Sequence, residues 1–196
     1  MPGLTFIVRA ERIDLHTATR AQTRRAVDRT ARDGGRTFTE EALDLVTEAS
    51  EGYPYVMQLV GHHAWRHAAL DSETIGIADV EQGIVEARRR LGRTLHWFSV
   101  RDLSLPQTRV LAATAFDNGP SRSADLARRT GESGPWIGKY RKELMTLGLL
   151  RAAGHGLAVP TAPFLREFLL THLDELLENP ADPLFEELER SQPTEG

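Results

Sequence analysis

Three histidines have the spacing most suited to metal chemistry. His63 and His67 lie four positions apart, so on a helix they share one face, an arrangement that can suit Zn²⁺, and His62 adjoins them. The chain contains no cysteine that would complete such a site with a thiolate. Because half-buried packing is the commoner role of such imidazoles, we expect no bound metal here.

The stretch SEGYPYVMQLVGHHAWRHA, residues 50–68, places the end of one helix and the start of the next one residue apart. Gly52 fits a left-handed position after a helix, and Pro54 fits a first helical turn. The N–H groups of Tyr55 and Val56 would then be free, and the proline ring with its aromatic neighbours offers a flat surface for a nucleobase. The pattern fits either a nucleotide-contacting corner or a plain tight connection with buried aromatic side chains.

No motif for covalent catalysis or phosphoryl transfer is present. The sequence has no G-x-x-x-x-G-K-[S/T] loop, no apolar strand ending in paired acids that would hold Mg²⁺, and no G-x-S-x-G turn. Its carboxylates are scattered over the surfaces of expected helices, where solvated ion pairs are the default. We therefore expect that the chain by itself is not an enzyme.

The first half of the chain predicts a small helical bundle. A short apolar strand, Leu4–Val8, precedes four helical segments, all within residues 15–98. The second segment begins after the N-cap candidate Thr39, and the third begins at Pro54. We expect TLHWFSVRDLS, residues 94–104, to be a linker from which Trp97 and Phe98 dock elsewhere.

The second half has a different order of elements. It predicts three helices, two strands joined by a glycine turn, and a last helix, within residues 104–116, 121–131, 132–148, 149–160 and 162–177. This is the order of a winged helix-turn-helix with a two-stranded wing. The expected fold class is therefore mainly α, a four-helix bundle followed by a winged helix. The acidic residues 179–196 are expected to be mostly disordered.

The third helix of this second half is the candidate reader of duplex DNA. Basic and aromatic side chains on it, three arginines before it and a histidine at the wing tip are the candidate contacts: Trp136, Lys139, Arg141, Lys142, Arg122, Arg128, Arg129 and His155. Two acids, Glu132 and Glu143, flank them, and the helix has no Asn or Gln to read adenine. DNA binding and protein contact both stay open for this module.

Composition and charge narrow the class of protein. The 196 residues are 40% hydrophobic and 27% charged, which is ordinary for one large or two small folded domains. No apolar run approaches the roughly 18 residues of a membrane span. The absence of cysteine excludes disulfides and agrees with a cytoplasmic location. The formal net charge of −4 comes entirely from the acidic tail.

This order of elements resembles the C-terminal part of a AAA-type ATPase, in particular the origin-recognition-like and STAND ATPases. In those proteins a nucleotide-binding sheet leads into a helical lid and often into a winged helix. LTFIVRAERIDL, residues 4–15, looks like their last core strand and its exit to the lid. Gly52-Tyr53-Pro54 matches the glycine-x-proline motif of STAND proteins, and its surroundings are similar to the GYPY-x-x-QLVG stretch of actinobacterial AAA lids.

The resemblance implies a division of the chain into a remnant core strand (1–14), a lid (15–98), a winged helix (99–178) and a tail (179–196). It also implies that five residues lie near a nucleotide: Arg9, Gly52, Tyr53, Pro54 and Tyr55. ATP or ADP with Mg²⁺ is implied for a full-length relative, not for this chain alone. The chain departs from the family in lacking both Walker motifs, and Tyr53–Tyr55 stand where many lids carry a sensor arginine.

The expected function is a regulatory one. The lid would sense the nucleotide and the winged helix would present an output surface to DNA or to a protein, with the missing nucleotide-binding core as a further partner and no membrane. One alternative is a stand-alone winged-helix transcriptional regulator. Another is an interaction or homo-oligomerisation module that uses Leu4–Val8 or Trp97–Phe98 as its contact surface.

Overall fold

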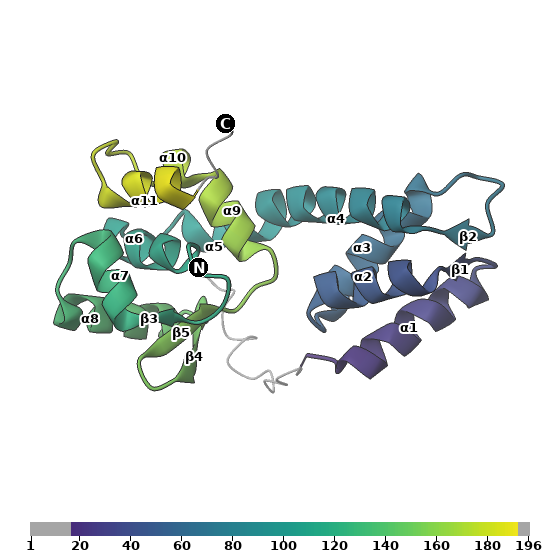
Figure 1. Cartoon of the computed structure of the whole chain (residues 1–196), viewed down its shortest axis with the longest axis horizontal. Helices are drawn as coiled ribbons and strands as arrows, with labels where there is room; N and C mark the ends of the chain where they lie inside the picture. The colour runs from purple at the N-terminus through teal and green to yellow at the C-terminus, as the bar shows by residue number, and fades with distance from the viewer. Residues whose placement is uncertain (1–16, 192–196) are drawn as a thin grey trace, which may run out of the picture.

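The computed structural model describes residues 17–191, and within them the protein is mainly helical, as the sequence predicts. Figure 1 shows two groups of elements joined by one long helical path. We call residues 17–91 the N-terminal unit and residues 92–191 the C-terminal unit. Arg9 and the expected strand Leu4–Val8 lie outside the described residues.

The N-terminal unit is built from four helices. They are α1 (Arg20–Asp33), α2 (Glu40–Ser50), α3 (Pro54–His67) and α4 (Ile77–Leu91). The expected cap Thr39 accepts a hydrogen bond from the Ala42 N–H (3.2 Å), and apolar side chains such as Val46 and Val80 are fully buried between the helices. Two short strands not expected from the sequence, β1 (Thr37–Phe38) and β2 (Thr74–Ile75), pair in parallel and fasten the loops before α2 and α4.

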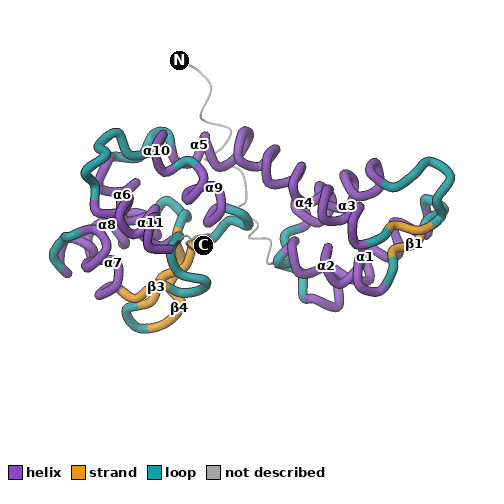
Figure 2. The backbone as a smooth tube through the Cα atoms, turned by 45° about the horizontal axis from the view of Figure 1, so that its top comes forward, coloured by secondary structure: helices purple, strands orange, loops and turns teal. Residues whose placement is uncertain are grey.

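Residues 105–160 of the C-terminal unit form three helices and a small antiparallel sheet. These are α6 (Leu105–Thr114), β3 (Ser121–Arg122), α7 (Ser123–Thr130), α8 (Gly134–Thr146), β4 (Leu150–Gly154) and β5 (Leu157–Pro160). The expected helix starts at Ser104 and Ser133 are present as caps. The sheet has the order β3-β5-β4, so it has three strands where the sequence predicts two (Figure 2).

One continuous helical path joins the units. After α4 the chain makes a π-helical turn, η2 (Gly92–His96), and continues as α5 (Trp97–Val100). The prediction of a linker here is therefore wrong. The physical reason is burial, because Trp97 and Val100 pack into the core of the C-terminal unit, whereas Phe98 is 55% exposed with the Arg101 guanidinium 4.5 Å from its ring.

The chain after β5 is also more ordered than the sequence predicts. The expected last helix is split into α9 (Leu165–Thr171) and α10 (Leu173–Leu176), and a further helix, α11 (Pro183–Ser191), packs on α6 and α7. Leu184 of α11 is fully buried, so the prediction of disorder is wrong for residues 179–191. Between residues 17 and 191, no helix is at once long enough and apolar enough to cross a bilayer.

Candidate functional site

The corner between α2 and α3 is shaped by a close approach of the chain to itself. Glu51 and Gly52 both adopt left-handed backbone conformations, with φ of 47° and 76°. The Gly52 carbonyl accepts a hydrogen bond from the Ala18 N–H (2.8 Å), and a Cβ on Gly52 would lie 2.2 Å from the Ala18 carbonyl oxygen. Only glycine satisfies both the backbone conformation and this contact.

Tyr53 connects this corner to the C-terminal unit. Its hydroxyl donates a hydrogen bond to the Thr161 carbonyl, just beyond β5. The Thr161 hydroxyl in turn donates to the Gly148 carbonyl (2.6 Å), directly after α8, and the Thr161 N–H donates to the Leu149 carbonyl (3.1 Å). A short series of hydrogen bonds therefore links the glycine–proline corner to the end of α8.

Charged side chains from both units surround this link. Burial raises the pKa of the Glu51 carboxyl, the nearby negative charge of Glu167 raises it further, and Arg151 of β4 lowers it. Burial also raises the pKa of the Tyr53 phenol, with a smaller contribution from Glu51. The phenol is therefore protonated near neutral pH and is available as a hydrogen-bond donor to Thr161.

The remaining residues of the corner, Pro54 and Tyr55, make fewer contacts with other parts of the chain. Pro54 occupies the first turn of α3, and the Met57 N–H bonds the Tyr53 carbonyl (2.9 Å). Tyr55 is 52% exposed. Pro54 and Tyr55 thus stay available for a ligand at the start of α3, whereas Gly52 and Tyr53 already bond other parts of the chain. Whether this corner contacts a nucleotide remains a prediction.

Phe164 interlocks the two units. It precedes α9 in the C-terminal unit, yet its ring belongs to the buried cluster of the N-terminal unit and is only 8% exposed. Its backbone is left-handed (φ 60°), which is costly for a bulky residue, so burial of the ring must offset the strain. The Arg88 guanidinium lies 5.1 Å from the ring centre.

Around the π-helical turn, aromatic rings pack closely. A Cβ on Gly92 would lie 3.2 Å from Cδ2 of Phe168, so glycine allows α9 to approach the turn. His96 is 1% exposed, its ring centre lies 5.4 Å from that of Phe168, and its Nε2 atom has no hydrogen-bond partner. Burial lowers the pKa of His96 to about 4. This ring is therefore neutral at physiological pH.

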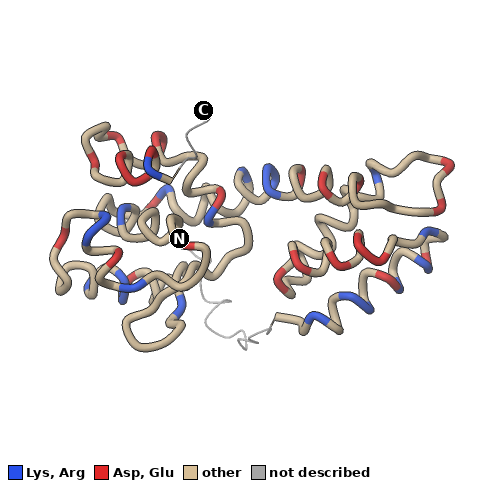
Figure 3. Tube along the Cα trace, viewed as in Figure 1, with Lys and Arg blue, Asp and Glu red and all other residues tan. Residues whose placement is uncertain are grey.

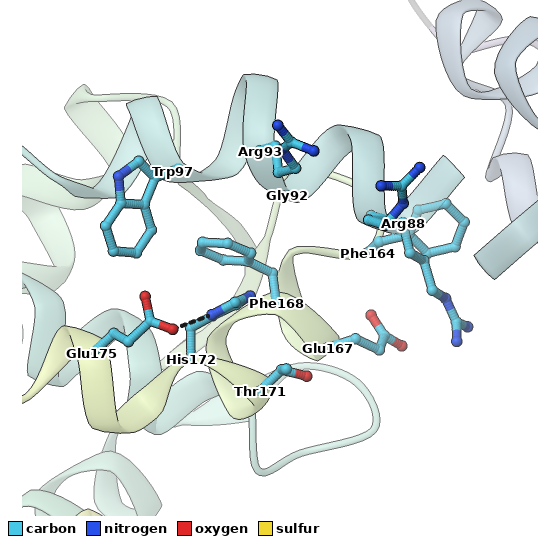
Figure 4. Close-up of a pocket in the computed structure, with 11 residues that line it drawn as sticks. Arg88, Gly92, Arg93, Trp97, Phe164, Glu167, Phe168, Thr171, His172 and Glu175 are labelled. Carbon is cyan, nitrogen blue, oxygen red and sulfur yellow. Dashed lines mark hydrogen bonds and ion pairs between the residues drawn. The ribbon is translucent and has the colours of Figure 1, made fainter. Parts of the chain in front are cut away.

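A cavity opens between the helical path and α9–α10, and we call it the joint cavity. It measures about 770 Å³, and Figure 4 shows the α4–α5 path and α9–α10 facing each other across it. Its lining combines arginines, aromatic rings and acids: Arg88, Arg89, Gly92, Arg93, Trp97, Phe164, Glu167, Phe168, Thr171, His172 and Glu175. None of residues 52–55 lines it, so it is separate from the corner.

Two of the expected DNA contacts are engaged inside the C-terminal unit. Arg129 is 8% exposed, pairs with Asp117 (2.6 Å) and Glu187 (3.1 Å), and donates to the Ala113 carbonyl (3.0 Å). Its expected role as a phosphate contact is therefore wrong, because it is an internal structural cation. Arg128 also pairs with Glu187 (3.1 Å) but stays about half exposed.

The other expected DNA contacts lie on α8, β3 and the wing. Lys139, Lys142, Arg122 and His155 are exposed. Figure 3 marks several acidic positions on α11, which lies at the side of the unit away from the wing. Arg141 is partly buried and bonds the Ser123 hydroxyl. Trp136 is also partly buried, with its ring centre 4.6 Å from that of Tyr140. The exposed set is thus smaller than the sequence predicts.

The histidines of α3 do not converge with other ligands. The His62 and His63 rings meet edge to face at 5.3 Å, and burial lowers the pKa of His63, with a further contribution from the charge of His62. Within residues 17–191, no group of three or more His, Cys, Asp or Glu side chains is placed to hold a metal ion.

Comparison with known proteins gives one family. A model of a domain of unknown function, DUF8462, matches residues 93–169, which is less than half of the chain and lies within the C-terminal unit. No curated protein matches the chain.

Sequence analysis did not identify several residues that connect the two units. Thr161, Phe164 and Glu51 carry no local motif, and their roles arise from contacts with residues far away in the chain. Gly92 offered a signal, because a glycine that directly continues an amphipathic helix after Leu91 is a costly choice unless a neighbour needs the space.

Proposed function

We propose that this chain is the C-terminal regulatory part of a AAA/STAND-like ATP-binding protein, with the N-terminal unit as lid and the C-terminal unit as winged helix. The observation that carries this proposal is the hydrogen-bonded series from Tyr53 through Thr161 to Gly148. It joins the corner expected to face the nucleotide to the end of the helix expected to face the output partner.

Coupling of the nucleotide to the output surface needs only two arrangements of the N-terminal unit relative to the C-terminal unit. A nucleotide against Pro54 and Tyr55 would favour one position of the corner, and Tyr53 would pass that preference to Thr161. Rotation of one unit against the other around the helical path would then move α8 as a rigid element. ATP or ADP with Mg²⁺ belongs to the complete ATP-binding protein, and we expect no metal-dependent ATP turnover by this chain alone.

The output surface is the exposed basic face of α8, β3 and the wing. Lys139, Lys142 and Arg122 have no ion-pair partner among residues 17–191 and are free to meet phosphates. This observation favours duplex DNA over a protein partner. It also supports a second candidate function, a stand-alone DNA-binding regulator, which would bind DNA without any influence of nucleotide.

Nitrogen-15 NMR of the full chain tests the coupling. Titration with Mg-ADP to about 10 mM detects even a millimolar complex. We expect the signals of residues 53–56 and of α8 to move together in the wild type. In Tyr53→Phe and in Thr161→Val, the signals of the corner should still move while those of α8 stay.

Tyr55→Phe is the matched control, because it removes a hydroxyl from the same helix turn, keeps the aromatic ring that would pack against the nucleotide, and does not touch the link to Thr161. It should keep both responses. Absence of any shift at the corner would contradict the nucleotide proposal. Movement of α8 that persists in Tyr53→Phe would contradict the proposed route.

A further inference from the structure

The joint cavity has the size and place of a ligand site. Its volume of about 770 Å³ is within the range of roughly 300–1,000 Å³ that small-molecule pockets occupy. It lies where the two units meet, with one wall from the α4–α5 path and the other from α9 and α10 (Figure 4). A ligand here would contact both units at once.

Unpaired positive charge marks one wall. Arg88 and Arg93 line the cavity, and neither makes an ion pair with a carboxylate among residues 17–191. Their neighbour Arg89 differs, because it is held by Glu86 at 2.6 Å. The Arg88 guanidinium does lie over the Phe164 ring, but that contact leaves its N–H donors free. Guanidinium groups without a carboxylate partner are suited to bind a carboxylate or a phosphate, often through two hydrogen bonds.

Aromatic rings form the floor. The Phe168 ring centre lies 6.2 Å from that of Trp97 and 4.7 Å from that of His172, and the Trp97 and His172 rings are related edge to face. Trp97 and His172 are only partly buried, so their free faces can pack against a planar group. Figure 4 shows Phe168 of α9, and His172 directly after α9, on the side of the cavity opposite the helix that carries Trp97.

The opposite wall is acidic and polar. Glu167 makes no ion pair among the described residues, and Thr171 is exposed beside it. The Glu175 carboxylate, in contrast, is held by His172 Nδ1 at 3.0 Å. Glu167 and Thr171 can therefore accept hydrogen bonds from a donor on the ligand, and they disfavour a ligand that is anionic at both ends.

The π-helical turn forms part of this cavity. Gly92 lines it, and such turns in otherwise α-helical segments occur frequently at functional sites. The turn lies between Arg88 and Trp97, so the guanidinium and the indole come from successive parts of one helical path. A purely structural contact between the units would not require two arginines without a carboxylate partner beside it.

We propose that the joint cavity binds a small aromatic organic anion, a planar ring that carries a carboxylate or a phosphate. The anionic group pairs with Arg88 and Arg93, and the ring packs against Trp97 and Phe168. Because the ligand contacts both units, it acts as an effector of their relative position. This site uses none of the residues of the corner and does not depend on a nucleotide.

Titration of the full chain with phenyl phosphate, followed by NMR signals of the Trp97 indole N–H and of Phe168 and Thr171, tests the proposal. We expect saturable shifts confined to the cavity. Phenylacetate separates a carboxylate from a phosphate as the anionic group, and saturable binding of either supports the class. Inorganic phosphate and benzyl alcohol supply the anion alone and the ring alone, and each should bind at least about tenfold more weakly.

The double variant Arg88→Gln, Arg93→Gln should weaken binding at least about tenfold. Arg90→Gln is the matched control, because Arg90 is exposed on the same helix but does not line the cavity. Both variants change exposed side chains, so the fold should persist, and an unchanged thermal unfolding midpoint checks this. Equal loss in Arg90→Gln, equal affinity for inorganic phosphate or benzyl alcohol, or no shift by either aromatic anion at about 10 mM would overturn the proposal.

Discussion

Helices α7 and α8 each carry a pair of basic residues that sequence analysis treats alike, yet the two pairs have different roles. Arg129 of α7 has a side chain only 7% exposed and is paired with two acids, whereas Lys139 and Lys142 of α8 are exposed. One of those acids, Glu187, lies 58 positions further along the chain. The sequence shows which residues are basic. Whether a basic side chain is free to bind a partner depends on acidic residues from distant parts of the chain, which only the fold brings close.

The largest expected effect is that of Arg129→Ala. This change leaves the Asp117 carboxylate and the Ala113 carbonyl without their buried partner. We expect a loss of about 3–5 kcal/mol in the free energy of unfolding, measured by urea denaturation. Lys142→Ala should stay within about 0.5 kcal/mol of the wild type. If both variants lost the same stability, the contrast between α7 and α8 would be invalid.

Burial also decides the behaviour of His96, which is 1% exposed. Burial lowers the pKa of His96 from 6.5 to about 4, while the Pro163 carbonyl and the charge of Glu167 oppose this effect. The folded state therefore disfavours protonation, so the stability is complete above pH 6.5 and is lost as the pH falls from 6.5 toward 4. The loss should reach about 3 kcal/mol.

Urea unfolding at several pH values across this window measures the effect. His96→Gln should flatten the profile, because an amide does not titrate, even if the variant is less stable overall. A steep profile that survives in His96→Gln would assign the pH dependence to other groups.

The third largest expected effect is the loss of DNA binding in the double variant Lys139→Glu, Lys142→Glu. With fluorescence anisotropy on a labelled duplex at low salt, we expect at least about tenfold weaker binding and a log–log salt slope smaller by about 1.8. Unfolding free energy should change by less than about 0.5 kcal/mol.

Arg25→Glu combined with Arg66→Glu makes the same charge change at exposed positions of the N-terminal unit. A loss of equal size in this control would mean that only net charge matters. No DNA binding by the wild type at low salt would remove DNA from the proposed function and leave a protein partner.

The smallest expected effect is that of Arg128→Ala. Arg128 shares the partner Glu187 with Arg129, but its side chain is 54% exposed, so its ion pair is screened by water. We expect a change in unfolding free energy, measured by urea denaturation, that is no larger than that of an ordinary surface substitution. Since Arg128 and Arg129 are adjacent and share one carboxylate, a loss near that of Arg129→Ala would show that burial does not set the difference.

The local signals of the sequence were sufficient to locate many helix boundaries. Thr39, Pro54, Ser104 and Ser133 act at the ends of their own helices through bonds to residues three or four positions away or through a fixed backbone angle. Such effects depend on nearby residue types alone, and for this reason they can be inferred from a single sequence.

Contacts between distant residues could not be inferred. Tyr53 and Thr161 lie 108 positions apart, and no pattern around either one indicates the other. The acidic segment around Glu187 has the composition of a disordered tail, but the buried Leu184 and the arginines of α7 provide the tertiary contacts that order it. The role of the corner and of the basic face in binding stays a prediction.

The position of Phe164 has a consequence for how the chain folds. The other members of the cluster that it completes lie between residues 27 and 91, so the N-terminal unit lacks one ring of its interior until the chain has extended at least 73 residues beyond that range. Closing such a long loop is slow compared with helix formation. During synthesis the first four helices would therefore emerge early. They would acquire their final packing late, when the C-terminal unit has folded and Phe164 packs into their core.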